Sequence, residues 1–179
     1  MSEVPRLPYI DSDVSGEVAE EIRARRAGRL TNLDRLLLQS PAIAAGWNHL
    51  LRAIRSEASL QSDLREVAIL RVAYLNGADY EWAAHQAPGR AAGLSLEDFD
   101  AIRGINTLNV LSSVRKAVVD YTDAMTNDVV VPNHVFSAIQ SLLDDQALLE
   151  LTVTVGCYNL VSRVLVALEL TAVEYERVQ

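Results

Sequence analysis

Two carboxylates and one imidazole occur at spacings that would let them meet on neighbouring helices. Glu81 and His85 are four residues apart, which places them on one face of a helix and within reach of each other. Glu66 precedes them, and the intervening Asn76-Gly77 pair is expected to fold two helices into a hairpin. A carboxylate can fix the tautomer of an imidazole, and burial raises the pKa of a carboxyl group, so such a cluster can exchange protons near neutrality. We therefore predict that Glu66, Glu81 and His85 form a catalytic site for proton transfer.

The same residues also allow simpler interpretations. Glu66 and Glu81 each fall in the first turn of an expected helix, where the helix dipole stabilises a carboxylate that has no other role. Two glutamates and a histidine could alternatively hold iron or zinc. However, the repeated Glu-x-x-His of di-iron bundles is absent, and His49 and His134 lack carboxylates at helical spacing. We therefore predict neither a metal nor another cofactor.

The helices that carry the three residues can be delimited from their ends. Val67–Leu75 is apolar on nearly every side, as expected of a central, buried helix. Asp63 with Glu66 has the spacing of a capping box at the start of this helix. Asn76-Gly77 would end it, because both residues tolerate a left-handed backbone. The next helix is expected to begin near Asp79.

The rest of the chain also favours helices. Ser95 with Asp98 is expected to cap a short helix, and Pro41 and Pro132 suit the first position of a helix, where the missing amide has no partner to lose. Helices are expected at residues 16–27, 32–39, 41–55, 112–127, 132–143 and 145–170. No segment of useful length shows the alternation of a strand, so we predict an all-α fold of eight or nine helices.

Length and composition indicate one globular domain. Of the 179 residues, 50% are hydrophobic and 22% are charged, which is typical of a folded protein with a substantial core. Residues 1–14, which include Pro5 and Pro8, are expected to form an N-terminal arm. Residues 15–179 are expected to form the domain.

Charge and cysteine usage exclude several classes of protein. The net charge of −8 and the lack of a long basic run argue against nucleic-acid binding. Arg71 and Arg163 interrupt the most apolar segments, so no membrane span is expected, and the polar N-terminus does not resemble a signal peptide. Cys157 is the only cysteine, which precludes an intrachain disulfide and favours a reducing compartment. We predict a cytoplasmic protein whose partner is a small molecule.

Several motifs resemble the carboxymuconolactone decarboxylase superfamily, which includes the alkylhydroperoxidase D proteins. The motifs near the candidate site are Leu64-Arg65-Glu66-x-Ala68-Ile69-Leu70-Arg71-Val72-Ala73, Asn76-Gly77-Ala78-x-Tyr80-Glu81-Trp82-x-x-His85 and Ala92-Gly93-Leu94-Ser95. A second match, typical of a large and mostly uncharacterised subgroup, is Glu150-Leu151-Thr152-x-Thr154-Val155-Gly156-x-Tyr158-Asn159-x-Val161-Ser162-Arg163. Together the matches cover about residues 15–170 and are specific for the superfamily rather than for one reaction.

The resemblance implies an alkylhydroperoxidase D-like helical bundle that assembles as trimers, or as hexamers made of trimers. In alkylhydroperoxidase D relatives, residues corresponding to Glu66 and His85 relay protons to a Cys-x-x-Cys pair, which here falls on Ala78 and Glu81. Without two thiols a sulfenic acid cannot be formed and resolved there. The resemblance therefore favours the decarboxylase branch, a cofactor-free lyase or isomerase of small carboxylated or lactone-like molecules. His85 would protonate the developing carbanion, and Glu66 or Glu81 would orient it.

Four further residues are candidates for substrate binding. Arg71 or Arg163 could pair with a substrate carboxylate, although each could instead satisfy a buried glutamate. Tyr80 and Trp82 flank Glu81 in the motif and are expected to line the same site.

Two other functions stay open on the sequence. The chain could be a non-catalytic oligomeric protein that binds a small molecule, or, as a weaker alternative, a peroxidase-related antioxidant protein that uses Cys157. In either case the apolar segment Val164–Leu168 exceeds what one small domain is expected to cover, which predicts a homo-oligomer. The resemblance suggests a trimer-based assembly, and a dimer stays open.

Overall fold

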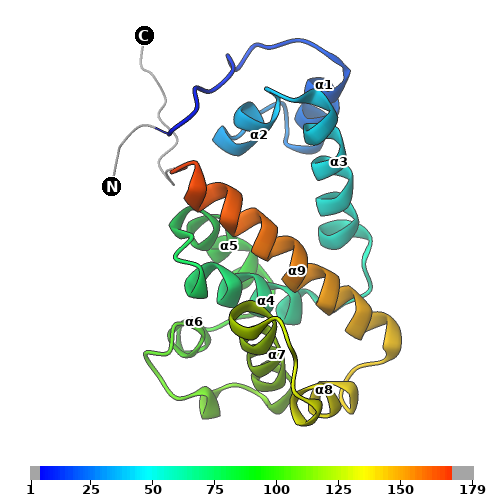
Figure 1. The fold of residues 1–179 in the computed structure, drawn as a ribbon, viewed down its shortest axis with the longest axis vertical. Helices are drawn as coiled ribbons and strands as arrows, with labels where there is room; N and C mark the ends of the chain where they lie inside the picture. Colours follow the sequence, from blue (N-terminus) through cyan, green and yellow to red (C-terminus); the bar gives the residue numbers. More distant parts are fainter. Residues whose placement is uncertain (1–4, 171–179) are drawn as a thin grey trace. The chain divides into compact units, whose positions relative to one another are not determined.

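The computed structural model of the 179-residue chain describes residues 5–170, and these residues form helices joined by short connections (Figure 1). The α-helices are α1 (Glu17–Arg25), α2 (Asn32–Leu37), α3 (Pro41–Arg52), α4 (Ser62–Leu75), α5 (Asp79–Ala91), α6 (Leu96–Ile102), α7 (Ser113–Asp123), α8 (Asn133–Gln140) and α9 (Asp145–Ala167). Two π-helices, η1 (Ala53–Glu57) and η3 (Ala124–Asp128), extend α3 and α7, and η2 (Leu108–Val110) is a 3₁₀ turn. No strand occurs within residues 5–170, which confirms the all-α prediction.

Contacts along the chain define two compact units, which are described separately. The first contains residues 5–57 and 168–170 of the described chain, and in it α3 packs against α1 and α2 around Ala19, Ile22, Leu38 and Ala44. The predicted division into an arm, residues 1–14, and one domain, residues 15–179, stays a prediction, and its ends lie outside the described residues.

The second unit, residues 58–167, is built around α4. Helix α4 packs against α5, α7 and α9 (Figure 1), and its residues from Val67 to Leu70 are fully buried. Burial on every side accounts for the run of apolar residues seen in the sequence, since a helix with only one buried face would show an apolar stripe. The prediction of a central, buried helix is confirmed.

Gly89 lets α5 lie close to its neighbours within this unit. A Cβ atom at this position would be 3.0 Å from Phe99 Cζ and 3.3 Å from Leu70 Cδ1. Leu70 belongs to α4 and Phe99 to α6, so the ends of side chains from both helices would have to shift by a few tenths of an ångström to admit a side chain at position 89. The glycine therefore leaves room for these side chains to pack closely against α5.

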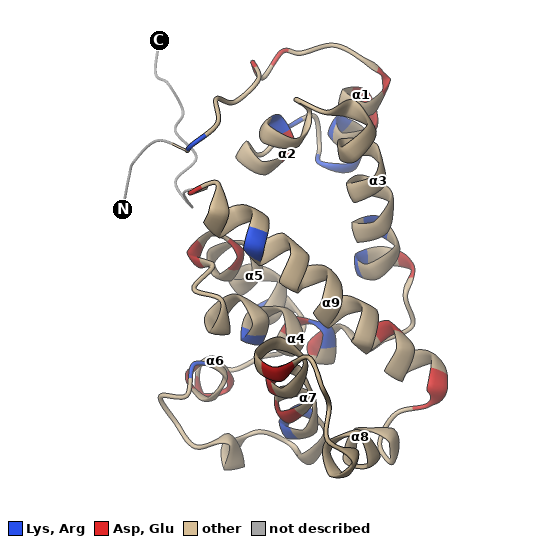
Figure 2. Ribbon diagram, viewed as in Figure 1, with Lys and Arg blue, Asp and Glu red and all other residues tan. Residues whose placement is uncertain are grey.

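Helix α9 is long and carries few charges (Figure 2). By length and composition it could cross a membrane, and it is the one such helix among the described residues. Half of its most apolar window is buried within the protein, and its contacts with α4 and α5 are those of a core helix. These contacts account for the apolar residues on its buried side, whereas Leu149, Val153 and Leu160 remain exposed.

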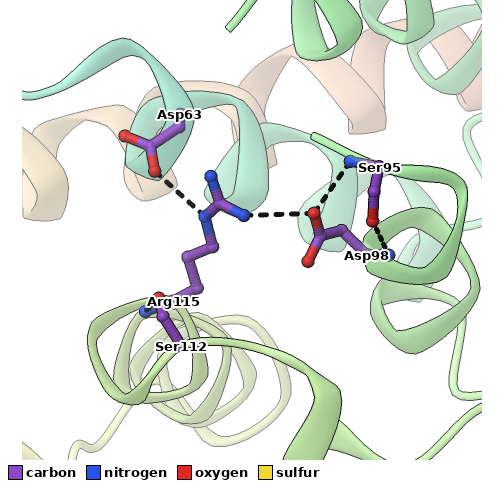
Figure 3. A network of polar contacts seen from close by, with 5 residues as sticks. All are labelled: Asp63, Ser95, Asp98, Ser112 and Arg115. Atoms are coloured by element: carbon purple, nitrogen blue, oxygen red, sulfur yellow. Dashed lines mark hydrogen bonds and ion pairs between the residues drawn. The ribbon is translucent and has the colours of Figure 1, made fainter. Parts of the chain in front are cut away.

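Arg115 on α7 joins three helices of the second unit (Figure 3). Its Nε donates to Asp63 Oδ2 of α4 at 3.0 Å, and its Nη1 donates to Asp98 Oδ2 of α6 at 3.1 Å. Asp98 also closes a capping box with Ser95, which confirms the cap predicted for this helix. The capping box predicted for Asp63 and Glu66 is wrong, because α4 begins at Ser62 without a side-chain cap and Asp63 instead pairs with Arg115.

Replacing Arg115 by Met is expected to lower the free energy of unfolding by about 2 kcal/mol. The side chains of Arg115, Asp63 and Asp98 are at most 22% exposed, so two carboxylates would lose a partially desolvated partner. The matched control is Lys116→Met, whose pair with Asp120 is exposed and contributes roughly 0.5 kcal/mol or less. Denaturant unfolding of the two variants measures the difference, and equal effects would show that the network does not join the helices.

Candidate active site

Three helices of the second unit position the candidate catalytic residues. Glu66 lies on α4, whereas Glu81 and His85 lie on α5, and the two helices are joined by a turn in which Gly77 has a φ of 62°. The Ala78 N–H donates to the carbonyl of Ala73 at 2.8 Å and closes the end of α4. This tight connection folds the hairpin that the Asn-Gly pair predicted. Helix α9 packs on both members of the hairpin.

Glu66, His85 and Tyr158 form a buried chain of hydrogen bonds. Glu66 Oε2 lies 2.7 Å from His85 Nδ1, and the Tyr158 hydroxyl lies 3.2 Å from His85 Nε2. The three residues are 3%, 7% and 0% exposed, respectively. When Glu66 is ionised it can only accept, so His85 donates from Nδ1 and its neutral form presents Nε2 as an acceptor for the Tyr158 O–H. A proton can thus pass between the hydroxyl and the imidazole while the carboxylate stabilises the imidazolium.

Glu81 is held separately by α9. It is 2% exposed, and the Ser162 hydroxyl lies 3.1 Å from its Oε1. The same hydroxyl also lies 2.8 Å from the carbonyl of Tyr158, so its one proton is shared between two acceptors. Within residues 5–170, no three His, Cys, Asp or Glu side chains cluster as metal ligands.

Arg71 is engaged on both edges of its guanidinium. Its Nε and Nη2 bind the two oxygens of Asp123 at 2.6 and 2.7 Å, and its Nη1 donates to the carbonyl of Ile102 at 2.6 Å. The hydrogen bonds to Asp123 raise the pKa of Arg71 above its ordinary value despite the opposing effect of burial. Because the pKa of Arg71 is raised in the folded protein, its pair with Asp123 stabilises the fold fully at every pH below the ordinary arginine pKa. This stabilisation is lost only as the pH rises through the raised pKa. Binding of substrate by Arg71, which stays a prediction, would require the exchange of Asp123.

The other predicted binding residues lie in different surroundings. Arg163 is exposed and donates to the carbonyl and the side-chain oxygen of Asn159, at 3.0 and 2.6 Å. Tyr80 is half-buried on α5. Trp82 lines a pocket of about 360 Å³ that is not lined by Glu66, Glu81 or His85. The assignment of all these residues to one site stays a prediction.

Tyr158 and Ser162 were not among the predicted site residues. Both occur in the second family motif, four residues apart, and both face the buried ends of α5 side chains. The signal in the sequence is this spacing of two hydroxyl side chains on a largely apolar helix, which also carries Thr152 and Thr154. Their partners lie 73 and 81 residues away in the chain, so the pattern alone could not identify the contacts.

Comparison with known proteins identifies the class of protein that has this fold and motif. Residues 41–124 match the Carboxymuconolactone decarboxylase family. No protein of curated function matches the chain significantly. The family match lies over the motifs around Glu66, Glu81 and His85, and it supports the resemblance to the carboxymuconolactone decarboxylase superfamily that these motifs suggested.

Solved structures share the fold over nearly the whole chain. An uncharacterized peroxidase-related protein from Silicibacter sp. TM1040 is 17% identical, with a TM-score of 0.80, and the match covers 99% of this chain and 96% of that one. An uncharacterized peroxidase-related protein with an alkylhydroperoxidase AhpD core, from Ralstonia eutropha JMP134, is 18% identical, with a TM-score of 0.78 and coverage of 97% and 95%. The debrominase Bmp8 is 12% identical, with a TM-score of 0.74 and coverage of 88% and 86%. At these identities the similarity establishes the alkylhydroperoxidase D-like fold alone.

Proposed function

We propose that this protein is a cofactor-free lyase or isomerase that uses His85 to transfer protons on a small carboxylated or lactone-like substrate. The observation that carries the proposal is the 2.7 Å contact between Glu66 Oε2 and His85 Nδ1. A buried carboxylate on one imidazole nitrogen fixes the tautomer and makes the other nitrogen a proton acceptor or, once protonated, a donor. Burial of a carboxylate and an imidazole costs free energy, which their mutual hydrogen bond offsets in part.

The reaction needs only proton transfer and a place for one electron pair. In a decarboxylation, the electrons of the C–C bond to the carboxylate move onto the adjacent carbon and its conjugated carbonyl as carbon dioxide leaves. The carbon then takes a proton from protonated His85, directly or through the Tyr158 hydroxyl, and His85 is reprotonated from solvent. In an isomerisation, His85 removes a proton from one carbon and returns it to another. Glu66 stabilises the imidazolium in both cases.

A relative of the same fold supports a small ring compound as the class of substrate. A variant of the debrominase Bmp8 was crystallised in complex with 2,3,4-tribromopyrrole. The identity of 13% carries no residue over to this chain. A thiol-dependent peroxidase reaction is supported less well, because Cys157 is the only cysteine and is 8% exposed.

One observation favours a second candidate, a non-catalytic binding protein. Tyr158 is fully buried, and the pocket of about 360 Å³ is lined by other residues, so a ligand could bind without reaching His85. We also propose that the protein is a homo-oligomer, because Leu149, Val153 and Leu160 are 63%, 41% and 49% exposed along one side of α9. We further propose that it is cytoplasmic, since its single cysteine can form no intrachain disulfide. Light scattering that gives a monomeric mass at all concentrations would contradict the oligomer.

The test of the proposed function is turnover of a defined panel. Purified protein is incubated with carboxylated five-membered lactones and with the corresponding decarboxylated lactones. Carbon dioxide release from the first set, or a shifted double bond in the second, is expected. For the decarboxylation, ¹H NMR in deuterated water would show one deuteron incorporated at the protonated carbon, because His85 is reprotonated from solvent. Binding of panel members without any turnover or exchange would support the binding protein and contradict the lyase and the isomerase.

A further inference from the structure

A pocket of about 360 Å³ opens between the end of α4, the start of α5 and the segment that follows α6. Ala73, Tyr74 and Ile105 form its apolar walls, and Asp79, Trp82 and Arg103 supply its polar groups. This volume lies at the lower end of the range for small-molecule sites, roughly 300–1,000 Å³. Because the Glu66–His85–Tyr158 chain does not line the pocket, a ligand bound there occupies a site distinct from the proposed relay.

Trp82 lines this pocket, and its indole N–H is a buried donor without an acceptor in the described part of the chain. The indole is 7% exposed, and none of the residues in the described range 5–170 accepts a hydrogen bond from its Nε1. A buried N–H without an acceptor is destabilising, whereas a ligand oxygen that reaches it would restore the missing bond. The indole therefore favours a ligand with a carbonyl or carboxylate oxygen.

Arg103 adds a positive charge above the same indole. Its guanidinium carbon lies 4.1 Å from the centre of the Trp82 ring. Arg71 and Arg115 are each bound to aspartates, but within residues 5–170 no carboxylate or hydrogen-bond acceptor is paired with the guanidinium of Arg103. A guanidinium stacked on a ring keeps its N–H groups directed outward from its edges, where they fit the two oxygens of a carboxylate.

Asp79 limits which acids the pocket would accept. Its side chain is exposed at the first turn of α5 and lines the pocket, so it would repel a second negative charge. It can accept a hydrogen bond from a hydroxyl group instead. The Tyr74 ring, which lines the pocket and is 45% exposed, offers a flat surface to a planar ligand.

We propose that the pocket binds a planar aromatic monocarboxylate that carries a hydroxyl group. The carboxylate pairs with Arg103 and reaches the Trp82 N–H, the ring packs against the apolar wall, and the hydroxyl donates to Asp79. The proposal does not depend on catalysis at His85.

The test uses 4-hydroxybenzoate as the probe and 4-hydroxybenzamide as its neutral counterpart. The chain has two tryptophans, so in Trp47→Phe the fluorescence reports on Trp82 alone. A saturable change with 4-hydroxybenzoate is expected, and the amide should bind at least about tenfold more weakly because it lacks the charge that Arg103 recognises. Free tryptophan in the same solutions corrects for absorption by the probe, and calorimetry on the unmodified protein provides a second measurement of affinity.

Matched arginine variants decide whether the pocket is responsible. Arg103→Gln should weaken 4-hydroxybenzoate binding by about tenfold or more and remove the preference over the amide. Arg90→Gln is the control, since Arg90 also lies over an aromatic ring, 5.9 Å from the centre of Phe99, but does not line the pocket. His85→Gln should leave the affinity unchanged, which separates this site from the proposed relay. Absence of saturable binding, or equal losses in both arginine variants, would overturn the proposal.

Discussion

Replacing His85 by Gln is expected to lower turnover of any substrate found in the lactone panel by roughly 10²–10⁴-fold, the range contributed by a positioned general acid or base. Glutamine keeps a polar side chain beside Glu66 but cannot take up or release a proton at neutral pH. Initial rates at saturating substrate measure the effect. Circular dichroism of the variant shows whether the helical fold is retained.

A second histidine provides the control for this experiment. His134 is exposed on α8, so His134→Gln removes an imidazole without touching the relay and should leave turnover unchanged. Full turnover by a folded His85→Gln variant would contradict the assignment of His85. Equal losses in both variants would indicate a general effect on the protein rather than loss of the relay.

Arg71→Met is expected to lower the free energy of unfolding by about 3 kcal/mol. The substitution removes the two contacts with Asp123 and the one with the Ile102 carbonyl. The side chain of Asp123 is 30% exposed, so the carboxylate left behind would remain only partly hydrated, which places the loss at the lower end of the range for buried pairs. Chemical denaturation measures it.

A double replacement tests whether the loss comes from the abandoned carboxylate. Arg71→Met combined with Asp123→Leu should recover part of the stability, because no charge is then left without its partner. Arg163→Met serves as an exposed control with an expected change of roughly 0.5 kcal/mol or less. The free energy of unfolding of Asp123→Leu is measured as well. If the double variant loses the sum of what Arg71→Met and Asp123→Leu lose separately, the two side chains do not stabilise each other.

The helical architecture could be predicted because its signals are local. The apolar run of α4, the Asn-Gly turn after it and the Ser95–Asp98 capping box each depend on residues within a few positions of one another. The π-helical extensions at Ala53–Glu57 and Ala124–Asp128 could not be predicted, since they differ from α-helix only in which carbonyl each amide binds. Their residues were expected to continue the preceding helices.

The site could be predicted only in part, because its contacts join distant residues. The nearness of Glu66 and His85 followed from the hairpin between them. Nothing local indicated that Asp63 would pair with Arg115, 52 positions later, so its spacing from Glu66 was misread as a cap. The Tyr158 contact with His85 likewise depends on how α9 packs, which periodicity does not specify.

Gly89 limits how freely this protein can be altered by engineering or natural drift. A Gly→Ala change inside a helix ordinarily gains about 1 kcal/mol through helix propensity. Here the added methyl group would meet the side-chain ends of Phe99, Leu94 and Leu70 at 3.0–3.3 Å, and these side chains would have to repack by a few tenths of an ångström. The gain in helix propensity and the cost of this repacking therefore oppose each other at one backbone position, within the hairpin that carries the Glu66–His85 contact.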